Sequence, residues 1–153
     1  EGGAKIHLAS GAIGGFDVLQ TVTLMAAAQK LPETAGIETH TGARGFRNTP
    51  VWEEHLLTDT EKTTVFTGNA KQAIATFPRR VNVAVATALA TTGPDITGVT
   101  MHSVPGWVGD DHCITAEIEG VKAVVDICSS TSAIAGWSAV SLLRNLASPV
   151  CFY

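Results

Sequence analysis

The residues that decide the fold lie at 113–128 and read CITAEIEGVKAVVDIC. Apolar and polar side chains alternate on both sides of Gly120, which predicts two antiparallel strands joined by a tight turn. Gly120 and Val121 are then the central residues of a type II′ turn, in which Gly120 takes a positive φ. This turn pairs Ile114 with Ile127 and puts every apolar pair on one face of the sheet. Slipping the register by one residue would destroy that match.

His112 directly precedes this hairpin and has the same parity as Ile114. Its imidazole is therefore expected on the covered side of the sheet, at the rim, beside Gly109, Asp110 and Asp111. A histidine that enters a sheltered space from a strand end can act as a general acid or base. The alternative is a structural histidine held by hydrogen bonds, which is the commoner role for a lone histidine.

Length and composition limit the classes of protein that fit. The 153 residues make one domain of ordinary size, or part of a larger protein. At 45% hydrophobic and 16% charged, the chain can build a full core, and the low charge suggests that another domain or subunit covers some of its surface. A net charge of −4 argues against a nucleic-acid partner. No apolar run approaches the ~18 residues of a membrane span, so no membrane partner is expected.

The three cysteines lack the spacing of a structural zinc site, and we expect no metal ligands in the chain. In the predicted hairpin register, Cys113 and Cys128 lie opposite each other, while Cys151 is near the end. All three are expected to be reduced thiols in a cytoplasmic protein. No signal peptide is visible, and the first residue is Glu1 rather than Met, so we expect a segment to precede it.

Strand-like and helix-like stretches alternate along the rest of the chain. Strands are expected at residues 5–9, 37–41, 63–67 and 96–104. Helices are expected at 16–30, from the N-cap Asn69 to Phe77, after Pro78 to about Thr92, and at 129–145. The last helix carries an apolar stripe of Ile134, Trp137, Val140, Leu143 and Leu146. The segment 42–50, rich in Gly and Arg, is a candidate lid, and 51–57 is a short helix or an edge segment.

Consecutive strands after residue 95 indicate the fold class. They predict an α+β domain with a mixed or antiparallel sheet and helices packed on one face. The turn at residues 10–15, SGAIGG, lies between a strand-like and a helix-like stretch, as in a dinucleotide-binding unit. A G-x-G-x-x-G motif starting at Gly11 would need glycines where Ile13 and Phe16 stand, however. A turn whose glycines permit close packing is the simpler interpretation.

Four short motifs resemble segments of the L-aspartate dehydrogenase family, and their order and spacing fit. They are SGAIGGFD at 10–17, FPRRVNVA at 77–84, the Asp-Asp-His run that ends at His112, and the pair Thr131-Ser132. In that family an N-terminal Rossmann domain binds the nicotinamide cofactor. A C-terminal α+β domain holds the substrate site and the dimer contact. The resemblance implies that residues 1–153 are this catalytic and dimerisation domain without the Rossmann domain.

The same resemblance implies roles for matching residues. His112 corresponds to the catalytic acid or base, and Ala12 and Asn82 to positions that contact NAD or NADP. The expected substrate-binding residues are Ser10, Gly11, Thr131 and Ser132. A tight turn is the alternative role for Ala12, and a hydrogen bond at a helix start for Asn82. The implied enzyme is a cytoplasmic homodimer that interconverts L-aspartate with oxaloacetate plus ammonia, using hydride from the cofactor.

Two lysines of the family pattern are missing. The family's Lys-Pro is replaced near residues 43–45, Ala-Arg-Gly, and the lysine of its NPKTS segment by residues 128–131, Cys-Ser-Ser-Thr. The carboxylates of oxaloacetate need cations or backbone N–H groups, for which Arg44, Arg79, Arg80 and the start of the last helix are candidates. A solvated surface charge is the alternative for each arginine. Two rivals stay open: a dehydrogenase of another amino or oxo acid, and a non-catalytic dimerisation or ligand-binding module.

Overall fold

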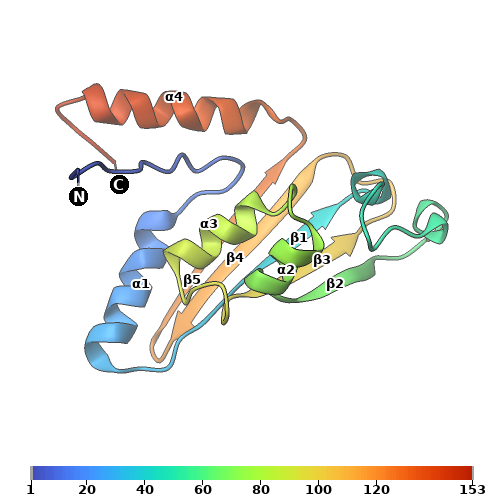
Figure 1. The fold of residues 1–153 in the computed structure, drawn as a ribbon, viewed down its shortest axis with the longest axis horizontal. Helices are drawn as coiled ribbons and strands as arrows, with labels where there is room; N and C mark the ends of the chain where they lie inside the picture. Colours follow the sequence, from blue (N-terminus) through green and yellow to red (C-terminus); the bar gives the residue numbers. More distant parts are fainter. Residues whose placement is uncertain (1, 153) are drawn as a thin grey trace.

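The computed structural model describes residues 2–152 as one five-stranded mixed sheet with helices on one face (Figure 1). The strands are β1 Thr34–Thr41, β2 Thr63–Asn69, β3 Gly98–Ser103, β4 Asp110–Ile118 and β5 Val121–Ser129, in the order β2-β3-β1-β4-β5. The helices are α1 Phe16–Gln29, α2 Ala70–Thr76, α3 Asn82–Ala90 and α4 Ala133–Ala147. The predicted α+β class is confirmed.

β1 lies in the middle of the sheet. It pairs in parallel with β3 and antiparallel with β4, so that Ile37 lies between Val99 and Ile114. The core is built where the apolar face of these strands meets α1, α2 and α3, with Leu19 and Ile114 fully buried. Side chains alternate along β1. Thr39 therefore lies on the same covered face of the sheet as Ile37, whereas Glu38 and His40 lie on the opposite face.

The hairpin forms as predicted, but its register differs. Ile118 pairs with Val121, so the turn consists of Glu119 and Gly120, with the positive φ of 80° at Gly120. The predicted Gly120–Val121 turn is therefore wrong, and Ile114 faces Val125. Side chains two residues apart lie on the same face of a strand, and the observed pairing differs from the predicted one by two residues. The covered face of β4 is consequently the predicted one.

The register change also corrects the placement of the cysteines. Cys113 lies opposite Asp126, and Cys128 lies opposite Asp111, so the two thiols do not face each other across the hairpin. Both are free, as is Cys151.

The segment between β2 and β3 follows its local signals closely. Asn69 caps α2 as expected: its side chain accepts a hydrogen bond from the backbone N–H of Gln72 at 2.9 Å, and the backbone N–H of Asn69 donates one to Gln72 Oε1 at 2.9 Å. This reciprocal pair is a capping box. Pro78 then separates α2 from α3. In the preceding segment, short 3₁₀ helices form at Ala43–Phe46 and Glu54–Leu57.

Two predictions at the ends of the chain are corrected. Residues 5–9 form no strand and pair with no strand of the sheet, and Ile6 is 90% exposed. α4 is a helix, but it projects away from the sheet and buries none of its residues (Figure 1). Four of its large apolar residues are exposed, among them Trp137 at 70% and Leu143 at 65%. Within residues 2–152, no helix is both long and apolar enough to cross a membrane.

Candidate active site

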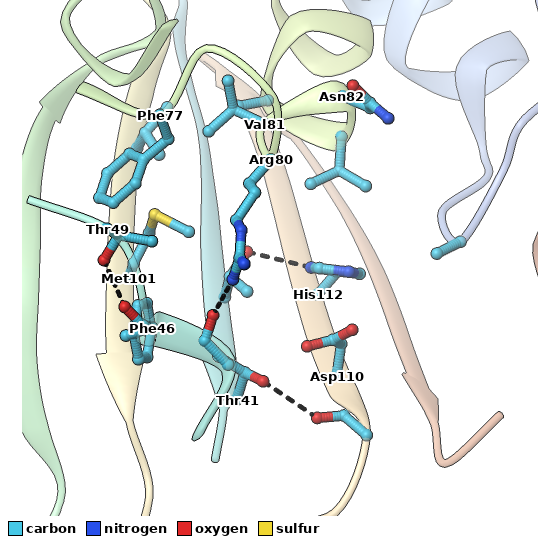
Figure 2. Close-up of a pocket in the computed structure, with 17 residues that line it drawn as sticks. Thr41, Phe46, Thr49, Phe77, Arg80, Val81, Asn82, Met101, Asp110 and His112 are labelled. Atoms are coloured by element: carbon cyan, nitrogen blue, oxygen red, sulfur yellow. Dashed lines mark hydrogen bonds between the residues drawn. The ribbon is translucent and has the colours of Figure 1, made fainter. Parts of the chain in front are cut away.

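A cavity of about 600 Å³ opens over the end of β1 and the start of β4, against the connection between α2 and α3 (Figure 2). This volume is typical of a small-molecule site. Ala12, Asn82 and His112, which lie far apart in the sequence, all line it. The structure therefore brings the predicted catalytic residue and both predicted cofactor contacts to one place.

His112 is buried, with 6% of its surface exposed, and is held from behind by a threonine. The antiparallel pairing of β1 with β4 sets Thr39 directly opposite His112. The Oγ1 atom of Thr39 lies 3.0 Å from Nδ1 of His112, within hydrogen-bond distance. This contact occupies Nδ1, so Nε2 is the ring nitrogen that can exchange a proton with a ligand.

Burial lowers the pKa of His112 below its ordinary value of 6.5, although Asp110 and Asp111 act in the opposite direction. The imidazole is therefore neutral at neutral pH and able to accept a proton. A neutral imidazole at a cavity is the form that a general base needs.

The start of α3 forms one wall of the cavity. Asn82 is its first residue, and no side-chain hydrogen bond caps the helix at Val81. The N–H groups of the first turn have no partner within the helix, and with the helix dipole they attract anionic groups. Ala12 lines the cavity from the turn before α1, where its small side chain leaves room for a ligand.

Arg80 is the cation of this site. Its side chain reaches down through the middle of the cavity, with His112 and Asp110 on one side and Phe46 on the other (Figure 2). The guanidinium donates a hydrogen bond to the carbonyl oxygen of Gly45 and so links the α2–α3 connection to the segment after β1. Of the three candidate arginines, only Arg80 lines the cavity; Arg44 and Arg79 are exposed elsewhere.

Several residues that line the cavity were not predicted from the sequence. Thr39 could have been found, because it shares the parity of Ile37 and lies near the end of its strand. Phe46 was hidden in the predicted lid segment; it is only 2% exposed, and its carbonyl oxygen accepts a hydrogen bond from Thr49 Oγ1 at 2.6 Å. Nothing local marks Met101, which reaches the cavity only because β3 pairs with β1.

Four predicted substrate contacts lie outside this cavity, and their role stays a prediction. The backbone N–H of Gly11 donates to Ser138 Oγ on α4 at 2.9 Å, and Ser10 lines a second hollow beside that helix. Thr131 and Ser132 are exposed ahead of α4, where Thr131 Oγ1 accepts a hydrogen bond from the backbone N–H of Ala133 at 3.2 Å.

Comparison with known families decides where this chain belongs. The family described as "Aspartate dehydrogenase, C-terminal" matches residues 22–146. The chain belongs to this family. An L-aspartate dehydrogenase of Methanococcoides burtonii is 33% identical over 98% of the chain, which covers 57% of that relative. An L-aspartate dehydrogenase of Ruegeria pomeroyi is 37% identical over 76% of the chain and is covered over 41% of its length.

Among solved structures, the aspartate dehydrogenase of Thermotoga maritima has the same fold, with a TM-score of 0.77 and 26% identity. That similarity covers 97% of this chain and 56% of the other. The chain thus spans about half the length of the aspartate dehydrogenases that it matches.

Proposed function

We propose that this chain is the substrate-binding and catalytic part of an NAD(P)-dependent L-aspartate dehydrogenase. One observation carries the proposal: Ala12, Asn82 and His112, each matched to a family motif, line a single cavity together with Arg80. The similar proteins named L-aspartate dehydrogenase support the same reaction.

The cavity suits an oxo dicarboxylate. The guanidinium of Arg80 and the N-terminus of α3 attract one carboxylate, which directs the carbon skeleton toward His112. In deamination, neutral His112 accepts the proton of the water that adds to the imine carbon. In reductive amination, the protonated ring returns a proton to the departing hydroxyl group.

Ala12 and Asn82 are the residues here that would contact the nicotinamide of NAD or NADP. The bound cofactor supplies the hydride. Ala12 would let the ring approach the backbone, and the Asn82 amide can both donate and accept hydrogen bonds. The rest of the dinucleotide needs a phosphate-binding turn, which SGAIGG does not supply, so we assign it to a separate Rossmann domain. We place the enzyme in the cytoplasm, as a homodimer.

Two rival functions rest on the two missing family lysines. A dehydrogenase acting on another amino or oxo acid would keep His112 and Arg80 but recognise a different second group. A non-catalytic module would keep only the fold. Arg80 favours an enzyme, because it brings a cation to the cavity where the family lysines are absent.

The test is an assay of the full-length protein with oxaloacetate, ammonia and NADH or NADPH. His112→Ala should lower kcat by ~10²–10⁴-fold, the usual contribution of a positioned proton-transfer group. Arg80→Ala should raise KM for oxaloacetate, whereas the adjacent surface variant Arg79→Ala should leave it unchanged. If His112→Ala keeps the kcat of the parent enzyme on every oxo acid tested, the non-catalytic module becomes the better interpretation.

NADH binding by the 153-residue chain alone tests whether the dinucleotide site needs a second domain or is complete in this chain. Titration calorimetry with NADH should give binding much weaker than micromolar, because no phosphate-binding turn is present. Micromolar binding would refute this division of labour.

A further inference from the structure

The face of the sheet opposite α1, α2 and α3 carries a cluster of metal-binding side chains. Glu38 and His40 are two residues apart on β1 and therefore share this face. Parallel pairing of β1 with β3 sets His102 beside His40, and their rings stack with centroids 4.9 Å apart and planes 17° apart. This cluster is separate from the cavity, which Thr39 reaches from the other face.

The donor atoms of the three side chains converge. Glu38 Oε1 lies 2.7 Å from His102 Nε2 and 3.2 Å from His40 Nε2. One donor atom from each residue lies within 4.8 Å of the other two. Around zinc, with bonds of ~2.0–2.1 Å, neighbouring ligand atoms are about 3.3 Å apart. Small rotations of these side chains would suffice to share one ion.

Each imidazole has an oxygen group beside its second ring nitrogen. His102 Nδ1 lies 3.0 Å from Thr64 Oγ1, a hydrogen-bond contact. His40 Nδ1 lies 3.3 Å from Asp111 Oδ2, but the two atoms lack hydrogen-bond geometry. Metal-binding histidines are commonly held this way, with the second ring nitrogen against a carboxylate or another oxygen group. The arrangement directs both Nε2 atoms toward Glu38.

A buried atom without a partner gives independent support. His102 is 6% exposed, and its Nε2 atom makes no geometrically acceptable hydrogen bond within residues 2–152, despite its proximity to Glu38. A buried polar atom in this condition is costly and calls for an explanation. A metal ion between Nε2 and the carboxylate would satisfy it.

The charges around the cluster already favour a cation. Lys62 places its Nζ atom 3.4 Å from Glu38 Oε1 and 3.4 Å from His40 Nε2. The Lys62 ammonium thus already lies beside two of the three donor atoms.

We propose that Glu38, His40 and His102 form a binding site for a divalent transition-metal ion of the zinc type, with the half-exposed Lys62 ammonium standing in the ion's place when no ion is bound. Two imidazoles and one carboxylate suit zinc or iron(II) rather than calcium or magnesium. The ion would tie β1 to β3 directly behind Thr39. This proposal does not depend on the proposed dehydrogenase function.

The test is titration of the metal-stripped 153-residue chain with ZnCl₂, followed by calorimetry and thermal unfolding. We expect one equivalent of zinc to bind with micromolar or tighter affinity and to raise Tm, because a ligand that binds only the folded state stabilises it. His40→Ala and Glu38→Gln should each weaken binding at least tenfold. Lys62→Ala should tighten it, because the competing ammonium is gone.

The matched control is His55→Ala. His55 is an exposed histidine 2.9 Å from Glu53 and 3.1 Å from Asp59, so it tests whether any histidine beside carboxylates captures zinc. This variant should bind zinc as the parent chain does. If Lys62→Ala binds no zinc, or if zinc binding survives Glu38→Gln and His40→Ala but is lost in His55→Ala, the assignment is overturned. Circular dichroism of each variant confirms that it is folded.

Discussion

A single threonine hydroxyl determines how His112 presents itself to the cavity. Thr39 Oγ1 lies 3.0 Å from Nδ1 of His112, and both groups are buried. The hydroxyl fixes the ring orientation without adding charge. This makes Thr39 a positioning residue, whose effect should be visible in turnover more than in folding.

Thr39→Val removes that hydroxyl while keeping the shape of the side chain. Losing about 1 kcal/mol, the typical net contribution of one hydrogen bond, corresponds to roughly a fivefold fall in kcat. The full-length enzyme should show this fall in steady-state assays. Thr39→Ser keeps the hydroxyl and is the control that should stay close to the parent. Parent-like kcat in Thr39→Val would mean that the ring is oriented by something else.

The lowered pKa of His112 makes the stability of the domain depend on pH. The folded-state pKa lies below the ordinary value of 6.5 because of burial. An unfolded chain therefore binds a proton near pH 6.5 while the folded chain does not. The stabilisation is complete above that pH and is lost as the pH falls toward the folded-state value. His102 acts with the same sign, again chiefly through burial.

Urea unfolding of the 153-residue chain at a series of pH values from 7.5 to 5 measures this effect. The free energy of unfolding should decrease with acidification, and His112→Gln should flatten the curve. His55 has its pKa raised, mainly by a hydrogen bond to Asp59, so His55→Gln should steepen it. An identical slope in the parent and in His112→Gln would contradict the assignment.

At the scale of elements, the position of β4 depends on a glycine at its start. Gly109 has a φ of 90°, and a Cβ there would overlap the carbonyl oxygen of Ser129 and lie 2.6 Å from the Cα of Ser130. Gly120 has a similar φ of 80° but nothing within 4 Å of a Cβ. The two glycines share the same backbone demand and differ in the space around them.

Gly120→Ala should cost about 1–2 kcal/mol of unfolding free energy, the usual penalty for a left-handed residue with a Cβ. Gly109→Ala should cost more and should also lower kcat, because β4 must shift where it carries His112. Denaturant unfolding and steady-state assays of both variants distinguish backbone strain from the steric clash of the added Cβ. Equal losses in both variants would show that the contact with β5 is easily relieved.

Local signals predicted the local elements. The capping residue Asn69, the helical spacing after Phe16 and the alternation around Gly120 each act within one turn or one strand. The hairpin register was missed because two registers differing by two residues bury the same side chains. The expected strand at 5–9 failed because strands need partners, which periodicity does not reveal.

The residues of the candidate site likewise fall into those that local motifs predicted and those that only the fold brings together. His112, Asn82 and Ala12 were accessible through motifs, and Arg80 was one of three candidates that only the fold could separate. The cluster of Glu38, His40 and His102 could not be predicted, since more than 60 positions separate His102 from the other two and only the parallel pairing of β1 with β3 joins them.

At the scale of the whole molecule, α4 carries four large apolar residues that are at least half exposed. Its apolar residues recur every three positions, from Trp137 through Val140 and Leu143 to Leu146. At 3.6 residues per turn they rotate by about 60° at each step and spread around the helix. A helix that is apolar on most sides is normally buried. The uncovered face of the sheet, by contrast, carries polar residues such as Glu38 and Asp111.

The family resemblance implies a dimer through the sheet, but because the uncovered face of the sheet is polar, we expect the homodimer to form through α4 instead. Sedimentation of the 153-residue chain at tens of micromolar should give a dimer, and Leu143→Glu should give a monomer. Arg144→Glu places the same charge on the neighbouring exposed position and should leave the dimer intact. A monomeric parent chain at that concentration would count against this interface.

The central place of β1 has a consequence for synthesis of the chain. β1 is complete at Thr41, but its two partners end at Ser103 and Ile118. At a translation rate of ~5–20 residues per second, the edge that pairs with β3 waits roughly 3–12 s and the edge that pairs with β4 roughly 4–15 s after β1 is made. Ile37 has no sheet to enter during that interval. The nascent domain is thus most exposed to misassociation on the ribosome, before the hairpin that completes its sheet has been made.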